Sequence, residues 1–266
     1  MSPLELFSKI HHLVISSNTI IIKRDEANCF LLHPAVAQFA SAFIKLYCLG
    51  PEHVYRYHEW MKDPDLLEAT GSEPLTYDEE VKMQQSWMND DTKCTFIVHS
   101  IDACQGNFEQ PETDIKSESN FKFVVEDNLD AMIGDVNLFF SELEDSSISD
   151  SDGVESQTKA HSERRMQAEI DIMIAEKEFR GKGFGRAATT AMLLYGKRKL
   201  GIDRFFCKIN EDNNDSIRLF KAIGFEVCSY AACFKQVELE SRMSLSEMEK
   251  RFKKHGGHYF SIPCSI

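Results

Sequence analysis

The stretch FRGKGFGR, from Phe179 to Arg186, decides how this chain folds. An apolar run of strand character, Ile170 to Ala175, precedes it, and a run of helical character, Ala187 to Leu200, follows it. A glycine-rich turn between a strand and a helix leaves backbone N–H groups unpaired, and the helix dipole adds partial positive charge to them. Because that arrangement binds phosphate, the stretch predicts a site for a phosphate-bearing ligand.

Two common phosphate loops do not match this spacing. A P-loop needs Ser or Thr after its Gly-Lys pair and a glycine five residues before it, but Gly183 and Glu176 stand at those places. The dinucleotide fingerprint needs its third glycine where Arg186 stands. The remaining pattern, Arg-x-x-Gly-x-Gly from Arg180 to Gly185, resembles the pyrophosphate loop of the GNAT acetyltransferases. The alternative is a glycine-rich turn that binds no ligand.

A second segment supports the GNAT resemblance. Arg204 to Ile209 has the character of a buried strand, and a polar turn with several possible helix N-caps follows it. Ser216 to Ile223 carries apolar residues at helical spacing, and Gly224 is placed as a stop signal. The whole, from Asn213 to Phe225, resembles the second GNAT signature, and one helix separates it from the first.

Further segments resemble one branch of the superfamily, N-acetyltransferase 9, which is associated with acetylating tubulin N-termini. The segments that carry this likeness are YHEWMK at 57–62, SEPLT at 72–76, KCTFIV at 93–98, GDVNLF at 134–139 and AEIDIMIAE at 168–176. The resemblance implies an α/β fold of the α+β kind, in which helices flank a mixed, mostly antiparallel sheet that splays at the cofactor strand. It implies one GNAT domain over residues 18–240, with insertions near 23–50, 101–120 and 141–165 and with tails at 1–17 and 241–266.

Local patterns add detail to this organisation. Asn18 to Ile22 resembles the family's first strand, and Ala35 to Tyr47 has the pattern of a helix within the insertion. The segment Glu52 to Lys62 predicts a short helix whose aromatic stripe belongs to the core. Thr76 and Glu79 form a capping box, so a helix should begin there and run to about Met88.

Composition restricts the class of protein. The 266 residues carry a net charge of −13, and the segment 106–166 holds fifteen acidic and five basic residues. Nucleic-acid binding needs a basic face, so we expect no nucleic-acid partner. The eight cysteines form neither a C-x-x-C pair nor a Cys/His pattern of zinc-site form, and neither a signal peptide nor a membrane span is predicted. We therefore expect a soluble, reduced, cytoplasmic protein without a bound metal or a membrane partner.

The resemblance also assigns the cofactor site. Acetyl-CoA would lie with its pantetheine arm along the strand that precedes the loop and with its pyrophosphate on the loop itself, while the second signature touches the arm from the other side. The residues assigned in this way are Met173, Ile174, Ala175, Arg180, Gly181, Lys182, Gly183, Phe184, Gly185, Arg186, Asn213 and Ser216. Asn213 is equally suited to be a helix N-cap, and the two roles are compatible.

Acetyl transfer to an amine also needs a base. Glu169 and Asp171 share one face of the strand because strand side chains alternate, so either carboxylate could take the amine proton, directly or through a water. Glu169 is the preferred candidate from the resemblance, and a solvated strand face is the alternative. Phe220 stands where GNAT proteins commonly carry the tyrosine that protonates the thiolate, which leaves Tyr195 and Tyr230 as substitutes.

The function implied is transfer of the acetyl group of acetyl-CoA to a protein N-terminal amine, with alpha/beta-tubulin as the expected acceptor. Two alternatives stay open. The acceptor could be another protein N-terminus or a small amine, or the chain could be an acetyl-CoA-binding module that has lost catalysis.

Overall fold

The computed structural model describes residues 28–33, 44–48, 50–100, 129–143, 165–254 and 258–263, with side chains over 50–100, 129–143 and 165–251. The strands are β1 (Asn28–His33), β2 (Ile44–Cys48), β3 (Lys93–Ser100), β4 (Met132–Glu142), β5 (Met166–Ile174), β6 (Arg204–Asn210), β7 (Glu226–Ala231), β8 (Gln236–Ser241) and β9 (His258–Pro263). The α-helices are α2 (Val54–Trp60), α3 (Pro64–Thr70), α4 (Tyr77–Met88), α5 (Phe184–Lys199), α6 (Asn214–Ile223) and α7 (Leu245–Lys254).

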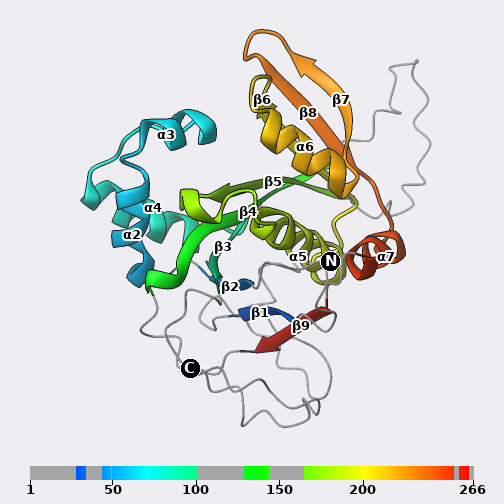
Figure 1. Cartoon of the computed structure of the whole chain (residues 1–266), viewed down its shortest axis with the longest axis horizontal. Coiled ribbons are helices and arrows are strands. Elements are labelled where there is room, and N and C mark those ends of the chain that lie inside the picture. The colour runs from blue at the N-terminus through cyan, green and yellow to red at the C-terminus, as the bar shows by residue number, and fades with distance from the viewer. Residues whose placement is uncertain are drawn as a thin grey trace, which may run out of the picture.

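The strands form one sheet in the order β7-β8-β6-β5-β4-β3-β2-β1-β9. Among the described strands β5 and β6 are the one parallel pair of neighbours, and α5 connects them. All other described neighbours are antiparallel. The mixed, mostly antiparallel sheet with flanking helices that the sequence predicted is therefore confirmed (Figure 1).

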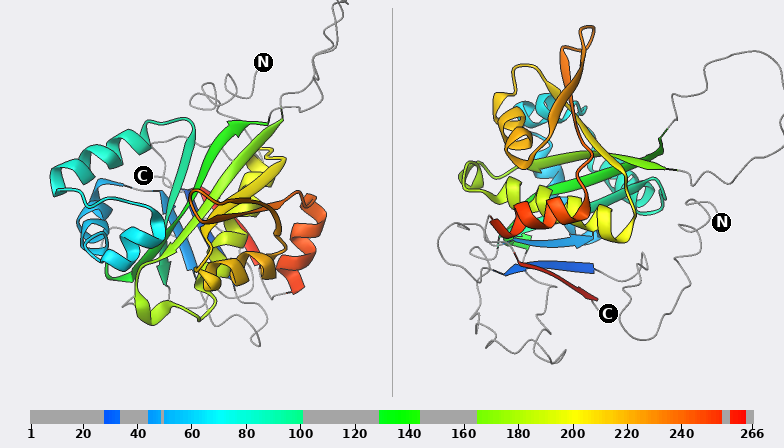
Figure 2. Two further views of the ribbon diagram at one scale, coloured as in Figure 1. Left: turned by 90° about the horizontal axis from the view of Figure 1, so that it is seen from above. Right: turned by 90° about the vertical axis from the view of Figure 1, so that its right-hand side faces the viewer.

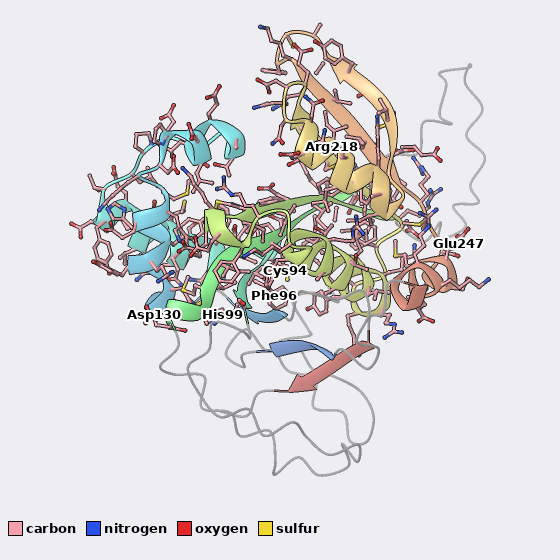
Figure 3. The ribbon with its side chains drawn as sticks, in the orientation of Figure 1. Cys94, Phe96, His99, Asp130, Arg218 and Glu247 are labelled. Atoms are coloured by element: carbon pink, nitrogen blue, oxygen red, sulfur yellow. The ribbon has the colours of Figure 1, made fainter. Side chains whose placement is uncertain are left out.

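Helices cover the sheet on two sides (Figure 2). The larger core lies between the sheet and α5 and includes Phe96, which packs edge-on against Tyr195 of α5 at 5.5 Å between ring centroids (Figure 3). A smaller core on the opposite face joins Ile97 and Met173 to Trp60 of α2. Because side chains alternate along a strand, Phe96 and Ile97 enter different cores, and the same alternation along β5 decides which residues face α2.

Most local predictions hold. The capping box is present, since the Thr76 hydroxyl accepts a hydrogen bond from Glu79 N–H, and the Glu79 carboxylate accepts one from Thr76 N–H at 2.8 Å. Gly224 ends α6 in the left-handed conformation, with φ of 113°. The structure adds α3, which the sequence patterns do not predict, although Asp63 caps it and Pro64 stands at its first turn.

One prediction is wrong where the structure tests it. The helix expected over Ala35 to Tyr47 conflicts with β2, because Ile44–Cys48 is extended and pairs with β3. Its β-branched and aromatic residues suit a strand that lies between two others. Residues 34–43, the expected strand Asn18 to Ile22 and most of the expected insertions at 101–120 and 141–165 lie outside the described residues. In the segment expected as a C-terminal tail, α7 packs on α5, and β9 pairs with β1.

Candidate active site

The sheet opens between β5 and β6. The two strands pair only from Gln167, opposite Arg204, to Glu169, opposite Phe206. Beyond that point β5 runs on to Ile174 with β4 still paired on its other side, whereas β6 turns away with the β7–β8 hairpin (Figure 1). The edge of β5 from residue 170 to residue 174 is therefore free to pair with an extended ligand, as the predicted splay requires.

The groups on this edge follow from strand alternation. Ala175 N–H donates to Ile133 O of β4 at 2.8 Å, so the amides of Ile172 and Ile174 point to the open side. Side chains of the protein itself occupy part of this edge. The Asp171 carboxylate accepts a hydrogen bond from Ile172 N–H at 2.8 Å, and Arg180 Nε donates to Ile174 O at 2.7 Å. Rotation of the Asp171 side chain would free the Ile172 N–H for a ligand, while Arg180 remains bound to the end of the strand.

The glycine loop delivers the N-terminus of α5 to this opening. Gly181 and Gly183 have φ of 72° and 94°, a conformation that glycine adopts without strain. Gly183 is the N-cap of α5, and the first intrahelical bond runs from Ala187 N–H to Gly183 O at 3.0 Å. The N–H groups of residues 184–186 therefore have no acceptor within the helix, which is the donor set that a pyrophosphate needs.

The loop's side chains have different roles. The Phe184 ring is buried against Phe179, 5.3 Å between centroids, so it fixes the loop and only its backbone can meet a ligand. Arg180 also donates to Ala175 O at 3.0 Å and thereby ties the loop to the end of β5. Lys182 and Arg186 are exposed and supply cationic charge at the mouth of the site.

The second signature lies against the first. A Cβ placed on Gly185 would be 3.5 Å from Leu219 Cδ2 of α6 and 3.7 Å from Ile174 Cγ1 of β5. Asn213 is the N-cap of α6, where its Oδ1 accepts a hydrogen bond from Ser216 N–H at 3.1 Å. The start of α5, the face of α6 and the free edge of β5 therefore meet, although the sequence separates them by tens of residues.

Glu169 and Asp171 lie on the face of β5 that faces α2 and α4, as the alternation predicts. Glu169 is held by Lys208 of β6, with 3.1 Å between Oε2 and Nζ. Asp171 lies two residues further along, beyond the last pairing with β6, and is exposed to solvent. Burial, with the charge of Glu169 as a smaller cause, raises the pKa of Asp171. A carboxylate with a raised pKa beside the open edge of the strand is suited to take a proton from an amine.

Asp135 and Tyr57 lie beside Asp171 and form with it a group of polar side chains beneath α2, called here the polar floor. Sequence reasoning did not predict that these two residues belong to the site. Asp135 of β4 is 2% exposed, and burial raises the pKa of its carboxyl to about 7, with the charge of Asp171 adding to the rise. The sequence pattern places Tyr57 of α2 in the core stripe, yet burial, then Asp135, Asp171 and Glu80, raise its pKa well above the ordinary value. The alternating polar residues of β4, Asp135 and Asn137, were the available signal.

Helix α2 is fixed over this floor by the end of β5. Glu176 Oε1 accepts hydrogen bonds from Arg56 Nη2 at 2.6 Å and from Trp60 Nε1 at 2.9 Å. Because Glu176 directly follows the strand that carries Asp171 and Met173, these two bonds set the distance between α2 and the free edge. The position of α2 over Asp135 and Asp171 is thus held by a residue just beyond the end of β5.

None of the tyrosines considered as general acid lies in this opening. Tyr195 is buried in the core under α5, on the face of the sheet opposite to Asp171. Tyr230 is exposed on β7 and donates to Glu211 Oε2 at 2.6 Å. Phe220 is buried against Phe225, so the position where the family commonly carries a tyrosine serves packing here.

Two further observations concern the described residues alone. Their His, Cys, Asp and Glu side chains form no group of three or more that could hold a metal ion. No helix among them is both long enough and apolar enough to span a bilayer.

Comparison with known proteins agrees with this geometry. Residues 45–226 match the acetyltransferase (GNAT) domain family. The chain belongs to the GNAT acetyltransferases and is an N-acetyltransferase of that family, which implies the use of acetyl-CoA.

Within the family it falls among the N-acetyltransferase 9-like proteins. It is 40% identical to an N-acetyltransferase 9-like protein of Nematostella vectensis, over 71% of this chain and 77% of that one. It is 39% identical to the human alpha/beta-tubulin-N-acetyltransferase 9, over 76% of this chain and 80% of that one.

Solved structures share the fold. The spermidine N-acetyltransferase of Vibrio cholerae in complex with CoA and spermine aligns with a TM-score of 0.51 at 17% identity, over 77% of this chain and 98% of that one. An uncharacterized protein of Bacillus halodurans aligns with a TM-score of 0.55 at 11% identity, over 85% of this chain and 96% of that one.

Proposed function

We propose that this protein transfers the acetyl group of acetyl-CoA to the N-terminal amine of a protein, and that tubulin is the acceptor. One observation carries the chemistry: the free edge of β5 ends at the unpaired N–H groups of the α5 N-terminus. The choice of acceptor is supported by relatives named alpha/beta-tubulin-N-acetyltransferase 9 in human, mouse and fruit fly.

The predicted cofactor residues have a consistent arrangement for this role. Met173, Ile174 and Ala175 would present backbone groups to the pantetheine arm, and the loop from Arg180 to Arg186 would hold the pyrophosphate through N–H groups and cationic side chains. Asn213 and Ser216 would close the arm from the α6 side. Bound acetyl-CoA supplies the activated acetyl group, and every proton transfer then falls to the protein.

The base is one of the two carboxylates on β5. Asp171 is nearer to the open edge and has the raised pKa, whereas the charge of Glu169 is compensated by Lys208. We therefore assign proton abstraction to Asp171 and a supporting electrostatic role to Glu169, which reverses the order of preference suggested by resemblance. The thiolate can leave without a dedicated acid, since a free thiol has a pKa of about 8.5.

A peptide assay tests the function. Synthetic peptides with the N-terminal sequences of α- and β-tubulin are incubated with acetyl-CoA, CoA release is followed, and mass spectrometry locates the acetyl group. We expect acetylation of the α-amine, and no reaction of the same peptides when their N-termini are blocked. If the enzyme acetylates lysine side chains or small amines in preference to the α-amine, the proposal that it acts on protein N-termini is refuted.

Variants then test the base. Asp171→Asn should lower kcat by about a hundredfold or more, because it removes a general base, and Glu169→Gln should have the smaller effect. Glu226→Gln, an exposed carboxylate on β7, is the matched control and should behave as wild type. Equal activity of Asp171→Asn and wild type would remove Asp171 from the mechanism. A cytoplasmic location, expected from the sequence, would bring the enzyme to this acceptor.

A further inference from the structure

The proposed function, on which this inference rests, leaves a proton to be removed from the site. An α-amine has a pKa of about 7.7–8.0, so at neutral pH it arrives mostly as an ammonium group. The new N–C bond keeps one N–H, so two protons leave the nitrogen. The C–S bond breaks and the thiolate takes up one proton. The other proton must reach bulk water in every turnover, and a bound protein acceptor would cover Asp171, which is exposed in the free protein.

A row of polar side chains continues from Asp171 into the protein beneath α2 and α4. Thr95, Asn137 and Asp171 are cross-strand neighbours on β3, β4 and β5, and Asp135 stands in the adjacent row. Asn137 Nδ2 donates to Asp135 Oδ2 at 2.8 Å. The other oxygens of this pair, Asp135 Oδ1 and Asn137 Oδ1, are buried without a hydrogen-bond partner among the described residues, as is Thr95 Oγ1. Buried oxygens of this kind are costly and point to a missing donor.

A small cavity adjoins this row. Its volume is about 10 Å³, close to what one water molecule needs, and its lining includes the polar side chains of Tyr57, Glu80, Gln84 and Thr95. Tyr57 interacts with Asp135 on one side, and the charge of Glu80 also acts on it. A single water in the cavity would give Thr95 a partner and would connect Tyr57 to Glu80.

Beyond the cavity, Glu80 lies close to the partly exposed His58. Glu80 Oε1 is 4.0 Å from His58 Nδ1, and this nitrogen has no hydrogen-bond partner among the described residues. The His58 side chain is 16% exposed and packs edge-on against the exposed Tyr77. An imidazole can both accept and donate a proton, so His58 is a suitable last member of a proton path.

We propose that Asp135, Tyr57 and Glu80, with one water in this cavity, carry the released proton from Asp171 to His58 at the surface. In each turnover Asp171 takes the proton from the amine and passes it to Asp135. Tyr57 accepts that proton while giving its own through the water to Glu80, and Glu80 passes it to His58. Every group is restored once His58 has released a proton to solvent, so the path needs no other reactant.

The charges around Asp135 suit this path. The titratable and charged side chains on this face of the sheet and on the helices over it include Tyr57 and His58 of α2, Glu80 of α4, Lys93 and His99 of β3, and Glu169 and Asp171 of β5. Burial raises the pKa of Asp135 to about 7, so this carboxyl can hold and release a proton near neutral pH, and burial also raises the pKa of Glu80.

The test compares Tyr57→Phe and Asp135→Asn with wild type on the tubulin N-terminal peptides. We expect kcat to fall by about tenfold with KM and acetyl-CoA affinity unchanged, because only a proton transfer is impaired. The solvent deuterium isotope effect on kcat should rise above that of wild type. The pH values at which kcat falls to half of its maximum should also differ from those of wild type. Tyr55→Phe, an exposed tyrosine on the same helix, is the control and should match wild type.

The outcomes separate the relay from the function on which it rests. If wild type is active and Tyr57→Phe has the same kcat and isotope effect, the proposed proton path is refuted and the proposed function still stands. Wild type without activity on the peptides would refute the proposed function instead. A high-resolution crystal structure tests the path in either case: we expect one water bonded to Thr95 Oγ1, and a dry cavity would overturn the path.

Discussion

The substitution Gly185→Ala should make the protein more stable and a weaker binder of acetyl-CoA. Gly185 lies in the first turn of α5 with ordinary helical φ, so alanine can occupy it without backbone strain. The nearest atoms to an added Cβ are 3.5 Å and 3.7 Å away, on Leu219 and Ile174, which is normal van der Waals contact. Replacing glycine in a helix by alanine gains about 0.5–1 kcal/mol, so the melting temperature should rise by about 1–4 °C.

The same methyl group should obstruct the ligand. Its two nearest neighbours are side-chain atoms of α6 and of the end of β5, so it would stand where these two elements approach the helix start, beside the N–H groups there. Losing one hydrogen bond to a charged phosphate costs about 1.5–3 kcal/mol, which weakens binding by roughly tenfold to a hundredfold. Isothermal titration calorimetry with acetyl-CoA and thermal unfolding of the free protein measure the two effects.

Gly196→Ala is the matched control in the same helix. Its Cβ would lie 2.8 Å from Phe205 Cε1 and 3.2 Å from Leu138 Cδ1, both in the core under the sheet. Overpacking of this kind costs about 1–3 kcal/mol, and acetyl-CoA affinity should stay as in wild type. If Gly185→Ala bound acetyl-CoA as tightly as wild type, the close approach of the ligand to the α5 N-terminus would be refuted.

Three further predictions address other parts of the site and fold. Arg180→Met removes two hydrogen bonds to the end of β5 and should weaken acetyl-CoA binding by about tenfold in calorimetry; unchanged affinity would show that these bonds do not position the loop. Burial raises the pKa of Asp135 in the folded protein to about 7, so the fold favours the protonated carboxyl. The stability that this preference contributes is lost as the pH rises from about 4 to about 7. Asp135→Asn should therefore gain in melting temperature relative to wild type over that range, and a difference independent of pH would contradict the raised pKa. Thr76→Ala breaks the capping box of α4 and should cost about 1 kcal/mol in denaturant unfolding, whereas Thr190→Ala, at a half-buried position within α5, should cost less.

The sequence predicted those parts of the site that are contiguous in the chain. The loop between β5 and α5, the N-cap and stop signals of α6, and the shared face of Glu169 and Asp171 all follow from local spacing, and the structure contains each of them. Local sequence patterns predict secondary structure less well where pairing with neighbouring strands decides the conformation of a segment. The apolar spacing that runs into Ile44–Cys48 suits a helix, yet pairing with β3 makes this segment a strand.

The acceptor side of the site could not be predicted because it depends on registers between strands. Asp135 lies opposite Met173 and Asn137 opposite Asp171 only because β4 and β5 pair as they do, and a shift of one residue would turn both polar side chains into the opposite core. Tyr57 belongs to the same floor because Glu176, at the end of β5, binds two side chains of α2. The strand whose free edge is proposed to bind the cofactor thus also sets the position of the groups proposed to carry the proton away. Substitutions at Glu176 should therefore disturb both halves of the reaction, although Glu176 itself lies in neither the glycine loop nor the carboxylate pair.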